Sequence, residues 1–332
     1  MRNQCVLLCS RPTGVAKAGD FEIVDRDIVL PAEGEILVRN RFLSVEPAMR
    51  GWIADVGNYS TPVPIGSVMR SLAVGEIIES RHPAWQSGDV VCGWFGWQSF
   101  ATVPASAIVR KVSQTDLPHS LALGVLGING VTALLALRSV GRPKEDDTVV
   151  VSTAAGGVGS AVGQLAKLAG CRTVGITGSD DKARMCVEQF GYDAAINYRD
   201  PQMEELLRAA CPDGVDIYYD NTAGAISDMV LRHLAIGARL IVCGTASVFD
   251  WSDWPMGPRV ERHLLVKRAS MSGFVIFDHD AEYDGAVAEL AELVRSGQLH
   301  YQEHVLQGIE RCPDAIAMLY RGENKGKLVV AL

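Results

Sequence analysis

Residues 149–160 read VVVSTAAGGVGS, and this segment is the strongest indication of the fold. A β-branched run typical of a buried strand enters a turn of small residues and then an apolar helix expected over 158–168. Small residues let backbone amides approach a pyrophosphate closely, and the helix N-terminus adds a favourable field. The stretch therefore predicts a dinucleotide site at Gly156, Gly157, Val158 and Gly159, with Gly159 also allowing close helix–strand packing.

The sequence around this turn strengthens the interpretation, because glycine turns alone join many strands to helices. From about Leu121 onward, β-branched runs alternate with helical patterns. We expect strands at 148–153, 172–177, 194–197, 215–219, 239–243 and 271–276. We expect helices at 158–168, 180–190, 201–210, 225–234 and 281–296. This alternation predicts an α/β fold with a doubly wound parallel sheet, a Rossmann domain over 121–299.

The first third of the chain has a different character. Short β-branched segments at 35–40, 73–79 and 89–92 are bounded by Gly, Pro and Ser, which indicates an antiparallel, barrel-like domain. The tail returns to strand character at 305–306 and 327–332 and is expected to rejoin that domain. With 332 residues, two domains are expected, one formed by 1–120 with 300–332 and the other by 121–299.

The end of the second expected strand indicates which dinucleotide binds. NAD sites usually place an acidic residue there, which binds the ribose 2′-hydroxyl. This chain reads GITGSDDK over 175–182, where Ser179 can hydrogen-bond a 2′-phosphate and Lys182 can neutralise it. Asp180 and Asp181 oppose an anion, although first-turn residues at these positions are expected to face solvent. The pattern favours NADP.

Composition excludes several classes of partner. The net charge of −8, without long runs of one sign, argues against nucleic acid and against an anionic membrane surface. The N-terminus does not fit a signal peptide, and glycines interrupt the apolar stretch 121–137 short of a membrane span. Eight scattered cysteines without a Cys-x-x-Cys indicate reduced thiols and a cytoplasmic location. No clustered ligand pattern predicts a metal site.

Ten short motifs along the chain resemble one family. They are EPAMRG (46–51), GWQ (96–98), LG with GVTA (126–133), AAGGVGS (154–160), GSDDK (178–182), INY (196–198), DN (220–221), CG (243–244), MSGF (271–274) and GENKGK (322–327). The series resembles the zinc-independent branch of the medium-chain dehydrogenase/reductase superfamily. That branch contains prostaglandin reductases (leukotriene B4 dehydrogenases), curcumin reductases and plant double-bond reductases.

The resemblance implies an N-terminal domain of the GroES-like kind and a homodimer with the sheet edge at 271–276 as its contact. It implies NADPH-dependent reduction of the carbon–carbon double bond of a small α,β-unsaturated ketone or aldehyde (an enone). It assigns cofactor contacts to Gly156–Gly159, Lys182, Tyr198, Asn221, Cys243, Gly244, Phe274, Val275, Ile276 and Asn324. It places Tyr59 beside the substrate carbonyl, and Arg50 as a residue that orients the substrate or the cofactor.

Two positions depart from the family pattern. Ala48 and Glu261 stand where many relatives carry pocket tyrosines, which leaves the substrate open. Two alternatives therefore remain. One is a quinone or carbonyl reductase on the same scaffold, and the other is a non-catalytic redox sensor that binds NADPH.

Overall fold

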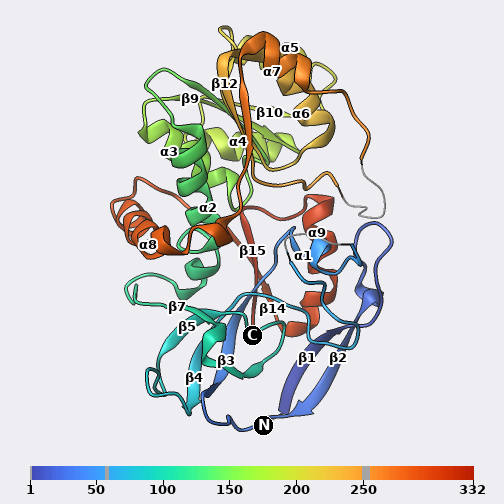
Figure 1. Cartoon of the computed structure of the whole chain (residues 1–332), viewed down its shortest axis with the longest axis vertical. Helices are drawn as coiled ribbons and strands as arrows, with labels where there is room; N and C mark the ends of the chain where they lie inside the picture. The colour runs from blue at the N-terminus through green and yellow to red at the C-terminus, as the bar shows by residue number, and fades with distance from the viewer. Residues whose placement is uncertain (1, 57–59, 249–254) are drawn as a thin grey trace. The chain divides into compact units, whose positions relative to one another are not determined.

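A computed structural model describes residues 2–56, 60–248 and 255–332 (Figure 1). The chain folds as two units, each with its own apolar core. The first unit holds residues 2–123 and 303–332, and the second holds 124–248 and 255–302.

The second unit is built on a parallel sheet. In the described residues its strand order is β10-β9-β8-β11-β12-β13. Its strands are β8 (Thr148–Ser152), β9 (Arg172–Thr177), β10 (Ala194–Asn197), β11 (Val215–Asp220), β12 (Leu234–Val242) and β13 (Ser270–Gly273). β8, the first of them in sequence, pairs with β9 on one side and β11 on the other, so the chain winds outward in both directions. The expected doubly wound parallel sheet is confirmed, and its strand order reverses beside β8, where ligands of such sheets bind.

Helices cover this sheet and complete the core of the second unit. They are α2 (Ile128–Ala136), α3 (Gly159–Leu168), α4 (Asp180–Glu188), α5 (Met203–Ala210), α6 (Gly224–Val230), α7 (Glu261–Lys267) and α8 (Asp280–Arg295). Fully buried Val150, Ile176 and Tyr218 from the strands pack with Leu207 of α5. No described helix combines the length and the apolar character needed to cross a membrane.

Three segments of the second unit differ from expectation. β12 begins at Leu234 instead of Arg239, and the helix expected over 225–234 ends at Val230, because a 3-10 turn at Leu231–His233 leads directly into the strand. The sequence does not predict α7, since none of its residues is buried and it shows no apolar stripe. The strand expected over 271–276 ends at Gly273.

The first unit contains a mostly antiparallel sheet and a separate hairpin, β1 (Arg2–Leu8) with β2 (Phe21–Asp27). The strand order of the sheet is β14-β15-β3-β4-β5-β7, with β6 also paired to β3. The strands are β3 (Glu35–Ser44), β4 (Ala73–Ser80), β5 (Val90–Gly93), β6 (Phe100–Pro104), β7 (Ile108–Lys111), β14 (Glu303–Gln307) and β15 (Lys327–Ala331). The unit also holds helices α1 (Met49–Trp52) and α9 (Cys312–Arg321).

The expected GroES-like barrel is not confirmed, because the described strands of the first unit do not pair into a closed ring. Within the sheet, β3 shares one edge between two partners. Its residues 35–39 pair with β6, and its residues 42–44 pair with β15, which is how the C-terminal tail joins this unit. The strand order therefore ends at β14 on one side and at β7 on the other.

Candidate functional site

The turn between β8 and α3 brings together the four residues predicted to hold a pyrophosphate. It begins at Thr153, whose φ is 54°, and the amide of Gly156 donates to the Thr153 carbonyl at 2.9 Å. A Cβ at Gly159 would lie 2.8 Å from Cα of Ala154 and still nearer to the Thr153 carbonyl oxygen. The buried Tyr192 hydroxyl donates to the Gly159 carbonyl at 2.6 Å. Close packing therefore makes this turn as tight as its glycines predict.

The amides in the middle of this turn have no backbone acceptor and can therefore bind a ligand. In the described part of the chain, the amides of Gly157 and Val158 donate to no backbone carbonyl, and both residues are partly exposed. Val158 stands at the N-cap of α3 without a side-chain cap. Uncapped amides at the start of a ten-residue helix form a site for an anion such as a diphosphate.

The residues predicted to bind a 2′-phosphate lie at the neighbouring strand end. Ser179 is the N-cap of α4, where its Oγ accepts the Lys182 amide at 3.3 Å, so its hydroxyl hydrogen remains available to donate. The partly exposed Tyr198 follows β10, and a Cβ at Gly178 would lie 3.2 Å from its ring. The structure brings Gly178, Ser179 and Tyr198 together.

Two acidic residues in the first turn of α4 already have partners. Asn197 donates through Nδ2 to Asp180 at 2.9 Å, and Arg184 forms an ion pair with Asp181. Both carboxylates are exposed, as their first-turn positions predict. These contacts weaken the repulsion that Asp180 and Asp181 would exert on a phosphate.

Asn221 and Gly244 form a second backbone cradle at the ends of β11 and β12. Asn221 donates through its amide to Ser152 Oγ at 2.8 Å and through Nδ2 to the Ser152 carbonyl at 2.7 Å. A Cβ at Gly244 would lie 2.9 Å from the Asn221 carbonyl oxygen. Both predicted residues therefore lie at the carboxyl edge of the sheet, next to the turn after β8.

Cys243 precedes this cradle, and its thiol is held neutral. The Tyr219 hydroxyl donates to Sγ at 3.5 Å, and burial raises the pKa of Cys243 to about 11. A neutral thiol is a poor nucleophile. Cys243 can line a groove, but its environment does not suit thiolate chemistry.

Asp220 organises this edge, although the sequence does not predict its role. Its buried carboxylate accepts the amides of Thr222 and Ala223 at 2.9 and 2.8 Å. It also accepts the hydroxyls of Ser152, Tyr218, Thr222 and Ser227. The sequence marks this position only by the Asp-Asn motif at 220–221, from which the resemblance assigns a cofactor contact to Asn221 and none to Asp220.

The segment predicted to meet the nicotinamide follows β13. The Phe274 amide donates to the Val242 carbonyl at 3.0 Å, and the Phe274 ring stacks on His279 with centroids 4.6 Å apart. In the described residues, the amides of Val275 and Ile276 donate to no backbone carbonyl. The amides of Val275 and Ile276 therefore remain available to a ligand, whereas their carbonyls accept the amides of Asp278 and His279.

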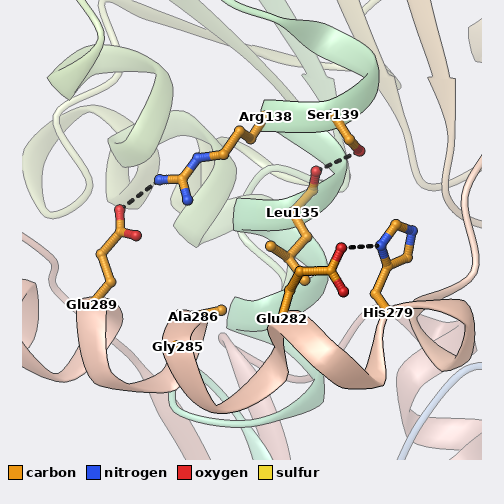
Figure 2. Close-up of a pocket in the computed structure, with 8 residues that line it drawn as sticks. All are labelled: Leu135, Arg138, Ser139, His279, Glu282, Gly285, Ala286 and Glu289. Carbon is orange, nitrogen blue, oxygen red and sulfur yellow. Dashed lines mark hydrogen bonds and ion pairs between the residues drawn. The ribbon is translucent and has the colours of Figure 1, made fainter.

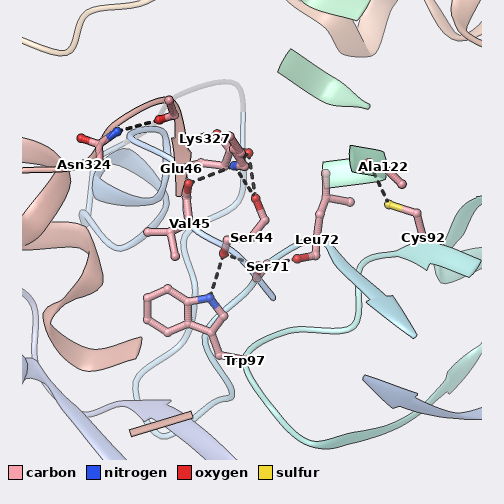
Figure 3. A network of polar contacts seen from close by, with 11 residues as sticks. Ser44, Val45, Glu46, Ser71, Leu72, Cys92, Trp97, Ala122, Asn324 and Lys327 are labelled. Carbon is pink, nitrogen blue, oxygen red and sulfur yellow. Dashed lines mark hydrogen bonds and ion pairs between the residues drawn. The ribbon is translucent and has the colours of Figure 1, made fainter. Parts of the chain in front are cut away.

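The remaining predicted residues belong to the first unit. Arg50 is 2% exposed and donates through Nε to the Gly14 carbonyl and through Nη2 to the Pro12 carbonyl at 3.3 Å. Asn324 is buried and donates to the Gly326 carbonyl at 2.8 Å, which shapes the turn before β15 (Figure 3). Tyr59 lies outside the described residues. The functional roles of all three stay predictions.

A cavity of about 460 Å³ lies elsewhere in the second unit. Figure 2 shows it between α8 and the end of α2 with the turn that follows. Its polar side chains are paired: Arg138 with Glu289 at 2.7 Å and His279 with Glu282 at 3.5 Å. None of the predicted cofactor residues lines it, so this cavity is separate from the candidate site.

Two family models match the chain. Residues 4–111 match a model described as the N-terminal domain of oxidoreductase, and residues 157–292 match one described as zinc-binding dehydrogenase. Across the described ranges, however, no three His, Cys, Asp or Glu side chains gather in a way that could hold a metal ion.

Known proteins resemble the chain over nearly its whole length. It is 38% identical to the NADPH-dependent curcumin reductase of Escherichia coli (strain K12), covering 99% of this chain and 96% of that protein. It is 35% identical to the NADP(+)-dependent 2-alkenal reductase of Nicotiana tabacum, covering 99% and 97%. The crystal structure of CurA from Vibrio vulnificus in complex with NADPH matches with a TM-score of 0.93 at 38% identity, covering 99% and 98%.

Three observations indicate the same family. They are the sequence motifs, the parallel sheet with the uncapped amides of its glycine turn, and the full-length similarities. The chain belongs to the zinc-independent branch of the medium-chain dehydrogenase/reductase family.

Proposed function

We propose that this chain is an NADPH-dependent reductase of the carbon–carbon double bond of α,β-unsaturated ketones and aldehydes. The observation that carries the proposal is the turn at Gly156–Gly159, where the uncapped amides of Gly157 and Val158 lie at the carboxyl edge of a doubly wound sheet. The names of two full-length relatives, a curcumin reductase and a 2-alkenal reductase, support the reaction type.

The residues present fit a dinucleotide. The amides of Gly157 and Val158 would bind the diphosphate, and the close approaches at Gly159 and Gly244 leave no space for a side chain. Asn221, Cys243 and Gly244 would line the groove, and the main chain at Phe274–Ile276 would bind the carboxamide. When bound, NADPH supplies the hydride, and the protein contributes binding, orientation and electrostatics.

The roles proposed for residues of the first unit in substrate binding come from the sequence resemblance. We assign Tyr59 the role of donating a hydrogen bond to the substrate carbonyl oxygen, which stabilises the negative charge that develops there. Arg50 orients substrate or cofactor in this proposal, and its donors also hold the carbonyls of Pro12 and Gly14. Asn324 contacts the cofactor. Ala48, in place of a tyrosine, leaves more room beside the substrate.

The purified protein is expected to oxidise NADPH when a medium-chain enone is added, and to use NADH much more slowly. The reason is that Ser179 and Lys182 can bind a 2′-phosphate, which NADH lacks. Absorbance at the nicotinamide band measures the rate with each cofactor. Equal kcat/KM for NADPH and NADH would contradict the role of Lys182.

A substrate panel separates the competing activities. Enone, quinone and simple ketone are compared at equal concentrations with NADPH, and the proposal expects the enone to give the highest kcat/KM. Preference for quinone or ketone would replace the proposed reaction with one of those. Stoichiometric NADPH binding without oxidation of NADPH by any enone would identify a non-catalytic sensor.

Lys182→Ala is expected to raise the KM for NADPH about tenfold or more and to change kcat less than about twofold. The lysine contributes uniform binding to a phosphate remote from the reacting carbon, so its loss weakens cofactor binding without changing the chemical step. The matched control is Lys167→Ala, an exposed lysine at the far end of α3 that pairs with Asp193. Lys167→Ala is expected to leave kcat and the KM for NADPH unchanged. An equal increase of the KM in Lys167→Ala would contradict a specific role of Lys182 in binding the 2′-phosphate.

We also propose a cytoplasmic homodimer that pairs through the edge at 271–276. β13 pairs with β12 alone among the described strands, and its residues are exposed. All eight cysteines are free thiols, which supports a reducing compartment. Sedimentation of the purified protein tests the dimer, and a monomer at micromolar concentration would contradict it.

A further inference from the structure

Arg199 is an exposed cation beside the residues proposed to bind the 2′-phosphate. It follows Tyr198, and its Cζ lies 5.5 Å from the centroid of the Tyr198 ring. The Arg199 amide donates to Asn197 Oδ1 at 3.1 Å, which holds the backbone of this turn. A guanidinium stacked on an aromatic face keeps its edge available for hydrogen bonds.

The Tyr198 ring links this arginine to the start of α4. The Tyr198 amide donates to the Thr177 carbonyl at 2.8 Å, so the ends of β9 and β10 lie side by side. The ring also packs on Gly178, where a Cβ would lie 3.2 Å from the ring. Gly178 is followed by Ser179, the N-cap of α4. Arg199 therefore lies on the same edge of the sheet as Ser179 and Lys182.

The carboxylates near Arg199 are bonded to other groups. Asp180 accepts Asn197 Nδ2 at 2.9 Å, and Asp181 pairs with Arg184. Asp200 accepts the Gln202 amide through Oδ1 at 2.8 Å. Within residues 60–248, none of these three carboxylates forms an ion pair with the Arg199 guanidinium. The guanidinium is therefore available to an external anion.

We propose that Arg199 is a specificity-determining residue that binds the 2′-phosphate of NADPH together with Lys182. This inference rests on the proposed function and deepens it. A 2′-phosphate carries up to two negative charges, which one lysine cannot balance. The planar guanidinium can donate two parallel hydrogen bonds to phosphate oxygens while its face stays on Tyr198.

The test uses equilibrium binding, so that it does not depend on turnover. Calorimetry compares 2′,5′-ADP with 5′-AMP, two probes that differ only by the 2′-phosphate. Arg199→Ala is expected to weaken 2′,5′-ADP binding about tenfold and to leave 5′-AMP binding within about twofold. Added salt is expected to weaken 2′,5′-ADP binding less in Arg199→Ala than in the wild type, because one charge pair is gone.

Two further variants make the result specific. Arg199→Gln retains a polar side chain without charge and is expected to lose as much affinity for 2′,5′-ADP as Arg199→Ala. Arg184→Ala removes an exposed arginine of α4 that pairs with Asp181 and is expected to bind both probes within about twofold of the wild type. Because Arg199 and Arg184 are both exposed, all three variants should unfold at the wild-type temperature.

Each outcome decides one question. If the wild type binds neither NADPH nor 2′,5′-ADP, the proposed function fails, and this inference fails with it. If the wild type binds both and Arg199→Ala retains wild-type affinity for 2′,5′-ADP, only the role of Arg199 is overturned. Equal weakening of 2′,5′-ADP and 5′-AMP also overturns it, because Arg199 would then support the adenosine and not the phosphate.

Discussion

Gly159→Ala is expected to weaken NADPH binding about tenfold or more and to destabilise the fold by about 1–3 kcal/mol. The added Cβ would lie 2.8 Å from Cα of Ala154 and closer still to the Thr153 carbonyl oxygen. Both obstacles are backbone, so α3 must move away from β8. That movement displaces the amides of Gly157 and Val158, which are proposed to bind the diphosphate. Calorimetric titration with NADPH and thermal unfolding measure the two effects.

Gly285→Ala is the matched control, because Gly285 lies in α8 of the same unit and a Cβ there meets no atom within 4 Å. Alanine has the higher helix propensity, so this variant is expected to be about 0.5–1 kcal/mol more stable and to bind NADPH as the wild type does. Wild-type NADPH affinity in folded Gly159→Ala would show that the turn does not hold the cofactor.

Lys327→Met is expected to lower the free energy of unfolding by about 3–5 kcal/mol. Lys327 is 5% exposed and forms an ion pair with Glu46. Its ammonium also donates to Ser44 Oγ at 2.7 Å and to the Val45 carbonyl at 3.0 Å, as Figure 3 shows. Burial lowers the pKa of Lys327, and Glu46 opposes that shift. Without the ammonium, the buried Glu46 carboxylate retains only the Ser44 hydroxyl among these partners. Denaturant unfolding measures the loss.

The double variant Lys327→Met with Glu46→Gln separates charge burial from packing. It is expected to recover part of the loss, because it leaves no unpaired charge at position 46. The control Arg321→Met breaks an exposed ion pair with Asp314 in the same unit and is expected to cost less than about 1 kcal/mol. A loss as small in Lys327→Met as in this control would show that the buried pair contributes little stability.

Local patterns explain which parts of the fold were predictable. The bounds of β9 and β10 match the expected strands, and α3 and α8 begin and end within one residue of expectation. Each of these elements combines an apolar run with flanking turn residues, such as Gly178 and Ser179 after β9. In α7, Leu264 is only partly buried against the core and no residue is fully buried, so the sequence carries no such pattern.

The candidate site was predictable to a similar extent. Gly156 to Gly159 could be found because the turn is encoded within about ten residues of chain. Asp220 could not, because its donors include Ser152, which is 68 residues away. The sequence does not predict a role for Arg199 in phosphate binding. That role requires Asp180, Asp181 and Asp200 to be bonded to other groups, and only the packing of the chain shows these partners.

The parallel sheet, the glycine turn and NADP as the cofactor can all be predicted from the sequence alone. These features follow from the order of short segments and from residue types whose local geometry is restricted. Two features become visible only in the folded chain: β3 shares one edge between β6 and β15, and Lys327 pairs with Glu46, which is 281 residues away in the sequence. Such contacts depend on how distant elements pack, and no local pattern in the sequence specifies that packing.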